Sequence, residues 1–270
     1  ESRVIEVENP LRAEESILRP RLLPGLLRAV AFNASHGNPD VALFELGTVF
    51  APPNRAHDTL PEERLHLAAV RSGRVRRMPH EPDRDVIAAD LVAALDAVAA
   101  ELRLADVRLE ATDWPGFHPV RTARVCVDGN TVGVVGEVDA DVVAALELPA
   151  PVDAFEVEVD ALLAGARRPR TARPVSRFPA STIDLAFVVD DTEPAGEILR
   201  TLEAAAGELC ERVELFDVFR SDALGVGKVS LAFSVRFRAL DRTLTDDEVA
   251  SLRRQCIDAV TKTHAATLRA

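Results

Sequence analysis

The stretch Ser230-Leu231-Ala232-Phe233-Ser234-Val235-Arg236-Phe237-Arg238 alternates strictly between large apolar residues and small or charged ones. Alternation with a period of two predicts a β-strand whose two faces meet different surroundings. Its large apolar side chains are expected to pack against helices. The opposite face is expected to be open and flat, because its residues are small, and basic, because it carries Arg236 and Arg238.

The residues on either side of this strand supply its neighbours. Strands are predicted over residues 183–189 and 213–219, a helix over 191–209 with Pro194 in its first turn, and a short final strand over 266–269. The run Thr245-Asp246-Asp247-Glu248 is a capping box that begins a second amphipathic helix. The order strand, helix, strand, strand, helix, strand is the ferredoxin-like motif, in which the helices cover one face of the sheet.

The preceding part of the chain predicts a mostly antiparallel sheet with helices, an α+β pattern. A helix is expected to begin around Pro24 and to end at Gly37, and a longer one to cover residues 85–104. Asp139 is expected to cap a short helix that runs to Leu146. The predicted strands are residues 41–50, 65–70, 107–111, 123–127, 132–138 and 155–159, with Asp128-Gly129-Asn130 as a hairpin turn.

A stretch rich in proline and arginine separates these two patterns. Residues 164–174 hold two prolines, one glycine and no apolar periodicity. We therefore expect a first domain over residues 1–165, a linker over 166–174 and a second domain over 175–270.

The composition of the 270 residues restricts the class of protein. Asp and Glu number 44 against 32 Lys and Arg, so the net charge of −12 argues against broad electrostatic binding of nucleic acid, although a small basic patch is compatible with it. No apolar run reaches the roughly 18 residues of a membrane-spanning helix, and we expect no signal peptide, because the stretch that opens with Glu1 is polar. Three scattered cysteines favour a reducing, cytoplasmic location over a disulfide framework.

Catalytic and cofactor motifs are weak throughout the sequence. Gly225-Val226-Gly227-Lys228-Val229 lacks the first glycine and the final Ser or Thr of a phosphate-binding loop, and Gly133-Val134-Val135-Gly136 lies within a predicted strand rather than before a helix. The six histidines show no metal-ligand spacing. We therefore expect no catalytic residue and no metal site.

The open face of the second domain offers a different chemistry. If Phe216 and Val218 belong to the core, alternation places Asp217 and Phe219 on the open face beside the serines and arginines of the neighbouring strand. An exposed aromatic ring, hydroxyl groups and cations on a flat sheet are how single-stranded RNA is bound. Packing of this face against another protein domain is the alternative, and these residues leave both open.

Several runs, in order along almost the whole chain, resemble the bacterial phenylalanyl-tRNA synthetase β subunit. In the first part these runs are Asn9-Pro10-Leu11, the stretch from Glu15 to Leu27, Leu43 to Phe50, Phe117 to Ala123 and Gly133 to Val138. In the second part they are Arg177-Phe178-Pro179-Ala180, Asp184-Leu185-Ala186, Leu215 to Phe219, Ser230 to Phe233 and Arg242 to Thr245.

The resemblance implies the C-terminal portion of such a subunit: a class II synthetase-like antiparallel domain without catalytic chemistry, followed by a ferredoxin-fold anticodon-binding domain. It implies an α₂β₂ enzyme whose α subunit uses ATP and magnesium to charge tRNA(Phe), with no cofactor bound by this chain. The apolar and acidic strand Phe155-Glu156-Val157-Glu158-Val159-Asp160 agrees with a non-catalytic domain, since its carboxylates would repel a triphosphate.

The resemblance assigns anticodon contacts to Ala186, Asp217, Phe219 and Ser230. The family often has Tyr in place of Phe219, and usually Lys immediately before the serine, where this chain has Val229 with Lys228 one residue earlier. The period of two places Lys228 on the face of Ser230. The candidate tRNA-binding residues are therefore Arg177, Ala186, Asp217, Phe219, Lys228, Ser230, Arg236 and Arg238.

A second functional hypothesis comes from a different class of protein. The net charge of −12 is compatible with a structural or subunit-interaction module that has no meaningful RNA affinity in isolation. On either hypothesis the first domain is expected to pack against the α subunit, and the leucine-rich helix from Leu22 to Val30 is a candidate interface, with a plain core role as its alternative.

Overall fold

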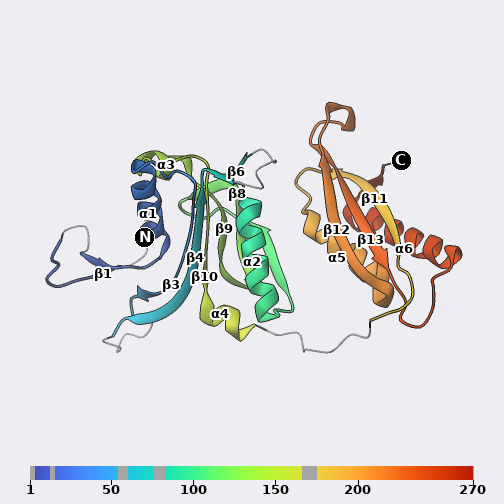
Figure 1. Ribbon diagram of the computed structural model, residues 1–270, viewed down its shortest axis with the longest axis horizontal. Coiled ribbons are helices and arrows are strands. Elements are labelled where there is room, and N and C mark those ends of the chain that lie inside the picture. Colours follow the sequence, from blue (N-terminus) through green and yellow to red (C-terminus); the bar gives the residue numbers. More distant parts are fainter. Residues whose placement is uncertain (1–3, 13–15, 54–59, 76–82, 166–174, 270) are drawn as a thin grey trace. The chain divides into compact units, whose positions relative to one another are not determined.

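The computed structural model describes residues 4–12, 16–53, 60–75, 83–165 and 175–269. The chain forms two compact units, residues 1–170 and 171–270 (Figure 1). The linker that the sequence predicts over residues 166–174 lies outside the described residues. Within the described parts of the chain, no helix is both long and apolar enough to cross a membrane.

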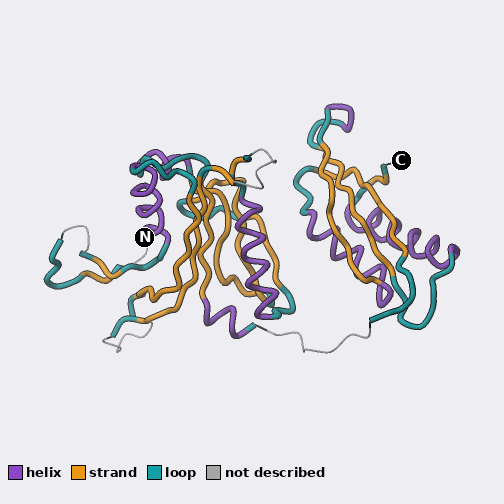
Figure 2. Tube along the Cα trace, in the orientation of Figure 1, coloured by secondary structure: helices purple, strands orange, loops and turns teal. Residues whose placement is uncertain are grey.

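The first unit is built on a sheet with helices packed on both sides (Figure 2). Its six strands follow the order β3-β4-β10-β9-β8-β7, and every neighbouring pair is antiparallel. Its strands are β3 Val41–Ala51, β4 Glu62–Ser72, β7 Val107–Ala111, β8 Phe117–Val127, β9 Asn130–Val138 and β10 Val152–Glu158. Its helices are α1 Leu23–Ser35, α2 Ala88–Leu102, α3 Ala140–Ala145 and α4 Val159–Ala164. Two short hairpins complete it: β1 Ile5–Glu6 with β2 Ile17–Leu18, and β5 Arg74–Val75 with β6 Arg84–Asp85.

Local sequence explains most of these elements. Pro24 occupies the first turn of α1, Asp139 caps α3 by accepting the N–H of Asp141 at 2.8 Å, and both features were expected. Asp128 and Gly129 both have positive φ, 49° and 77°, as a two-residue turn between right-twisted strands requires. The chain therefore folds back sharply from β8 into β9.

Helix α1 belongs to the core of the first unit. Its apolar side chains Leu23, Leu26, Leu27 and Val30 are all buried, and they pack against β3, β4, β9 and β10. These side chains therefore have the core role that was the alternative to an interface, and contact of the helix with the α subunit stays a prediction. Helices α2 and α4 cover the opposite face of the same sheet. The inner strands of the sheet, β10 above all, are consequently buried on both sides.

The second unit is a four-stranded sheet with one face covered by two helices (Figure 1). Its elements are β11 Ser181–Asp190, α5 Ala195–Ala206, β12 Cys210–Phe219, β13 Lys228–Phe237, α6 Asp246–His264 and β14 Thr267–Leu268. The strand order β12-β13-β11-β14 and the order along the chain are those of the ferredoxin-like fold. Pro194 is the residue that precedes α5 rather than a member of its first turn.

The alternation in β13 gives the expected division of faces. Leu231, Phe233, Val235 and Phe237 are buried in one core together with Ile198 and Leu202 of α5 and Leu252, Cys256 and Val260 of α6. All of these residues lie on the helix side of the sheet. The other side of β13 has no helix over it among the described residues.

Strand β12 departs from the prediction. A β-bulge between Leu215 and Asp217 leaves Phe216 out of the pairing, and Phe216 and Val218 are 57% and 48% exposed instead of lying in the core. The reason is that β12 is an edge strand, so the helices do not extend over its outer end. Phe219 still reaches the open face, because past the bulge it pairs with Ser230.

Candidate nucleic-acid interface

The register of the second sheet gathers four of the candidate residues. Ala186 of β11 and Asp217 of β12 both pair with Ala232 of β13, one on each side. Ser230 of β13 lies in the next row of the same face and pairs with Phe219. Because paired residues in a sheet point to the same side, Ala186, Asp217, Phe219 and Ser230 share one end of the open face.

The floor of this area is made of small residues. Ala186, Ala232 and Ser230 contribute a methyl or a hydroxymethyl group each, so a planar ligand can approach the backbone. Phe219 rises beside them at the edge with 40% of its surface exposed. Ser230 is only 2% exposed, although no helix covers this face. Its two cross-strand neighbours, Phe219 and Val188, are larger than the serine and flank it on both sides.

Arg269 is a member of this area that the sequence reasoning missed. Its backbone N–H donates to the carbonyl oxygen of Ala186 at 2.8 Å, which continues the pairing of β14 with β11. Its guanidinium carbon lies 4.6 Å from the centroid of the Phe219 ring, which is a cation–π contact. The prediction of a strand over residues 266–269 was the available signal, because a strand there brings Arg269 level with Ala186.

Lys228 occupies the first position of β13, two residues before Ser230. It pairs with Asp190 in the register, and its Nζ lies 2.8 Å from Oδ1 of that aspartate. Gly225 and Gly227 have φ of 99° and 72°, conformations that favour glycine, and they form the turn into the strand. These glycines therefore serve a tight turn, and the lysine is held by a carboxylate.

Arg236 and Arg238 lie at the other end of the face. Arg236 is six residues from Ser230 along β13, which corresponds to about 20 Å. Both arginines contact one carboxylate, that of Glu211: Nε of Arg236 at 2.5 Å and Nε of Arg238 at 3.0 Å. Nη1 of Arg238 also donates to the carbonyl oxygen of Ser176 at 3.4 Å, which places the neighbouring Arg177 at this end.

The expectation of a basic open face is corrected by these contacts. The row between the two ends contains Ser234, which pairs with Asp184 on one side and Glu214 on the other. Carboxylates therefore occupy the middle of the face, and Glu211 offsets the arginines at its end. The structure brings together Ala186, Asp217, Phe219 and Ser230, and it separates them from Arg177, Arg236 and Arg238.

The run Arg242-Thr243-Leu244-Thr245 has a structural role. Oγ1 of Thr245 accepts the N–H of Glu248 at 3.3 Å, and Oε2 of Glu248 accepts the N–H of Thr245 at 2.8 Å, as the capping box predicts. The N–H of Thr245, followed by the Arg242 guanidinium at 2.7 Å, lowers the pKa of the Glu248 carboxylate to about 2. The motif fixes the start of α6, the helix that buries the core face of the sheet.

The buried carboxylate of Glu156 serves the fold of the first unit. Glu156 of β10 accepts the N–H groups of Leu22 and Leu23 at 3.0 and 3.2 Å, and Nδ1 of His66 lies 2.8 Å from the same carboxylate. Glu156 thus replaces the absent side-chain cap of α1. Gly136 of β9 allows the backbone of β8 to approach closely, because a Cβ at this position would lie only 2.6 Å from the carbonyl oxygen of Arg121.

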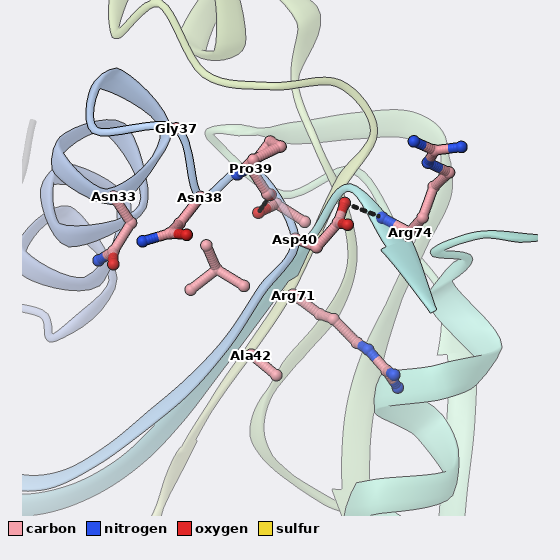
Figure 3. Close-up of a pocket in the computed structure, with 10 residues that line it drawn as sticks. Asn33, Gly37, Asn38, Pro39, Asp40, Ala42, Arg71 and Arg74 are labelled. Carbon is pink, nitrogen blue, oxygen red and sulfur yellow. Dashed lines mark hydrogen bonds between the residues drawn. The ribbon is translucent and has the colours of Figure 1, made fainter. Parts of the chain in front are cut away.

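One hollow of the first unit also has a structural explanation. It lies between the end of α1 and the strands β3 and β4 and has a volume of about 630 Å³, and Figure 3 shows the residues that line it. Oδ1 of Asp40 accepts the N–H of Arg74 there at 2.8 Å, and Arg71 points toward α2, where its Nη1 lies 3.7 Å from Asp90. Among the described residues, no cluster of His, Cys, Asp and Glu could hold a metal ion.

Comparison with known families follows the division into two units. Residues 1–159 match the phenylalanyl tRNA synthetase beta chain CLM domain, and residues 176–269 match the ferredoxin-fold anticodon binding domain. The chain belongs to the phenylalanyl-tRNA synthetase β-chain family. The family match and the ferredoxin-like topology confirm the fold that the sequence predicts.

Individual relatives in this family cover nearly the whole chain. The phenylalanine–tRNA ligase β subunit of Moorella thermoacetica is 39% identical over 99% of this chain and 33% of its own length. The corresponding subunits of Corynebacterium glutamicum and Streptomyces avermitilis are 39% and 37% identical over 99% of this chain, and 34% and 35% of their own lengths. The chain thus spans about a third of these relatives. A solved pyrrolysyl tRNA synthetase from Desulfitobacterium hafniense aligns with a TM-score of 0.44 and 14% identity, over 59% of this chain and 51% of that chain.

Proposed function

We propose that this chain forms the C-terminal part of the β subunit of a phenylalanine–tRNA ligase, and that its second unit binds the anticodon region of tRNA(Phe). The β-subunit relatives and the anticodon-binding family of residues 176–269 support this assignment. One structural observation connects this assignment with individual residues. In the sheet register, Ala186, Asp217 and Ser230 lie beside the exposed ring of Phe219 on a face without helices.

Each of these residues has a chemical role in the proposal. The ring of Phe219 stacks on a base, and the carboxylate of Asp217 and the hydroxyl of Ser230 form hydrogen bonds with base edges. The methyl group of Ala186 lets the base approach the sheet. Lys228 contacts phosphates near this end of the face, where its own carboxylate partner, Asp190, competes with them.

The three arginines at the far end serve the flanking nucleotides. Arg177 is exposed, with its guanidinium carbon 5.7 Å from the centroid of the Phe178 ring, and Arg236 and Arg238 share Glu211. A polyanion that approaches this end competes with Glu211 for the two arginines. The separation from Phe219 corresponds to several nucleotides of an extended strand, so one RNA segment can meet both ends.

The catalytic work belongs to a partner in this proposal. ATP and magnesium act on the α subunit of a cytoplasmic α₂β₂ enzyme, and this chain contributes binding and assembly. Exposed apolar residues on the first unit support a packing role. Phe44 and Leu46 of β3 are 77% and 58% exposed and, two residues apart, lie on the same side of an edge strand.

Binding of tRNA(Phe) to the full chain tests the proposal. We expect binding that weakens as salt rises, and that also weakens when the anticodon is changed while the rest of the tRNA is kept. The same comparison in the assembled enzyme, read as KM for the two tRNAs, covers recognition that needs the other subunit. If neither form discriminates between the two tRNAs, the proposal is wrong and the interaction-module hypothesis takes its place.

A further inference from the structure

A small hollow of the first unit lies beside the start of α1, on the side of the sheet that α1 covers. It has a volume of about 220 Å³ and is lined by the segment before α1, by β4, β9 and β10, and by Trp114 from the loop between β7 and β8. That volume is the space of about seven liquid water molecules, and it is below the roughly 300 Å³ at which sites for drug-sized ligands begin. The hollow is therefore too small for a nucleotide and fits a small metabolite.

Two acceptor groups line this hollow on neighbouring strands. Glu158 and His66 pair in the register of β10 and β4, so their side chains share one face. Nδ1 of His66 lies 2.8 Å from the Glu156 carboxylate, which can only accept, so in the neutral ring Nε2 is an acceptor. Oε2 of Glu158 lies 3.9 Å from Nη1 of Arg64, whose closer partner is Glu62 at 2.9 Å. Glu158 and Nε2 of His66 are therefore weakly engaged acceptors that suit an ammonium group.

Two donor groups of the same hollow lack acceptors. The guanidinium carbon of Arg21 lies 5.7 Å from the centroid of the Trp114 ring, and within the described parts of the chain no carboxylate forms an ion pair with it. The indole N–H of Trp114 is buried and also has no acceptor among the described residues. A buried donor without an acceptor is costly, and a guanidinium binds a carboxylate strongly. Arg21 and Trp114 therefore suit a carboxylate group.

The charges that line the hollow balance one another. Arg21 and Arg64 stand against Glu156 and Glu158. A ligand with a net charge would leave one of these side chains uncompensated in a partly enclosed site, which is unfavourable. The remaining walls include the apolar side chains of Pro20, Val132 and Val134. The complementary ligand therefore carries one positive group, one negative group and an apolar body.

We propose that this hollow binds a free α-amino acid with an apolar side chain. Its carboxylate accepts from Arg21 and from the indole N–H of Trp114, and its ammonium group donates to Glu158 and to Nε2 of His66. Its side chain packs against the indole ring and the valines of β9. All of these residues belong to the first unit, so the site is separate from the proposed RNA interface and does not depend on it.

Fluorescence of Trp114, the single tryptophan of the chain, gives a direct readout of this site. The full chain is titrated to about 10 mM with L-leucine, with L-phenylalanine, and with the amine and the carboxylic acid that correspond to each and lack one charged group. Isothermal titration calorimetry repeats each titration. We expect saturable binding of at least one amino acid, and binding of its amine and its acid that is at least about tenfold weaker.

Two variants each remove one of the charges that the proposal uses. Arg21→Gln and Glu158→Gln should each weaken binding of the amino acid about tenfold or more. Arg21→Gln should leave the affinity for the amine unchanged, and Glu158→Gln should leave the affinity for the acid unchanged. Arg28→Gln on α1 and Glu63→Gln on β4 are the matched controls, because both side chains are exposed and lie outside the hollow. Urea unfolding shows that each variant is folded.

Three outcomes would overturn the proposal. No saturable binding of either amino acid by fluorescence or calorimetry would mean that water alone fills the hollow. An amine or an acid that binds as tightly as its amino acid would mean that one charged group is not recognised. Equal loss of binding in the two variants and in their controls would place the ligand elsewhere on the chain. The RNA-binding proposal for the second unit stands or falls separately.

Discussion

The two sheets of this chain differ in how many of their faces are covered. Strand β10, at the centre of the first sheet, is buried on both sides, and its Glu156 caps α1 from within the core. Strand β13, at the centre of the second sheet, is buried on the side of Phe233 and open on the side of Ala232. Glu156 therefore serves the fold of the sheet that is covered on both sides, whereas Asp217 and Phe219, at the edge of the sheet that is covered on one side, remain exposed.

Truncation of the covered face should have the largest effect. Phe233→Ala is expected to destabilise the second unit by about 3–5 kcal/mol, because Phe233 is fully buried between the sheet and its two helices. The change is measured by chemical denaturation, with amide hydrogen exchange in β11 and β13 as the probe of unfolding. The neighbouring Ser234→Ala on the open face should change stability by less than about 0.5 kcal/mol. Equal effects of the two substitutions would contradict the division into faces.

The buried carboxylate of Asp153 gives the first unit a dependence on pH. Asp153 of β10 is 1% exposed, and neither of its oxygens has a hydrogen-bond partner among the described residues. Burial, with the nearby charges of Glu137 and Asp90, raises the pKa of Asp153 to about 7. Since the folded state holds the proton more tightly than the unfolded state, stability is greatest below about pH 4 and is lost as the pH rises toward 7.

We therefore expect the unmodified chain to lose about 2–3 kcal/mol of unfolding free energy at this group between pH 5 and pH 8. In Asp153→Asn that part of the pH dependence should be absent. Fluorescence of Trp114, the single tryptophan of the chain, reports unfolding of the first unit in urea at both pH values. Glu63→Gln, at an exposed site on β4, is the matched control. An identical pH dependence in Asp153→Asn and the unmodified chain would show that Asp153 is ionised throughout.

An aromatic residue on the open face should matter for RNA and little for the fold. Phe219→Ala is expected to weaken tRNA(Phe) binding by about 1–3 kcal/mol, or about 5- to 150-fold, through loss of stacking on one base. Its unfolding free energy should change by less than about 1 kcal/mol, because the ring is 40% exposed. Phe216→Ala on the same strand is the control, since the bulge removes Phe216 from the pairing. Equal loss of binding in both variants would place the contact elsewhere.

The smallest effect is expected at the arginine end of the face. Arg236→Ala should lower the slope of log affinity against log salt by about 0.7, the value for one phosphate of a single strand, with little loss of affinity at moderate salt. The loss is small because Glu211 already holds this guanidinium at 2.5 Å in the free chain. Titrations at four or more salt concentrations measure the slope. A slope equal to that of the unmodified chain would mean that Arg236 meets no phosphate.

Periodicity and capping signals were sufficient for most of the fold. The alternation in β13, the capping box at Thr245 and the turn at Asp128 and Gly129 each depend on residues close together in sequence, and all are found in the structure. The sequence also placed Phe219 on the open face. It failed at Phe216 and Val218, because a bulge and the limited reach of the helices over an edge strand are properties of the assembled sheet.

Contacts between distant residues account for what the sequence did not predict. Arg269 meets Phe219 across the sheet, and Glu211 joins Arg236 to Arg238. The face was expected to be basic from the residues of β13 alone, whereas Asp184 and Glu214 come from its two neighbours. The charge of a sheet face depends on the register of all its strands, which one strand does not reveal.

The most direct test of the central claim is to map where RNA contacts the second unit. Amide NMR signals of the isotope-labelled full chain, followed during titration with an anticodon stem-loop of tRNA(Phe), distinguish the open face from the helix face. The open-face account predicts shifts that are largest around Ala186, Asp217, Phe219, Ser230 and Arg269, and small along α5 and α6. Shifts centred on α6 or on the first unit, with Phe219 and Ser230 unchanged, would contradict it.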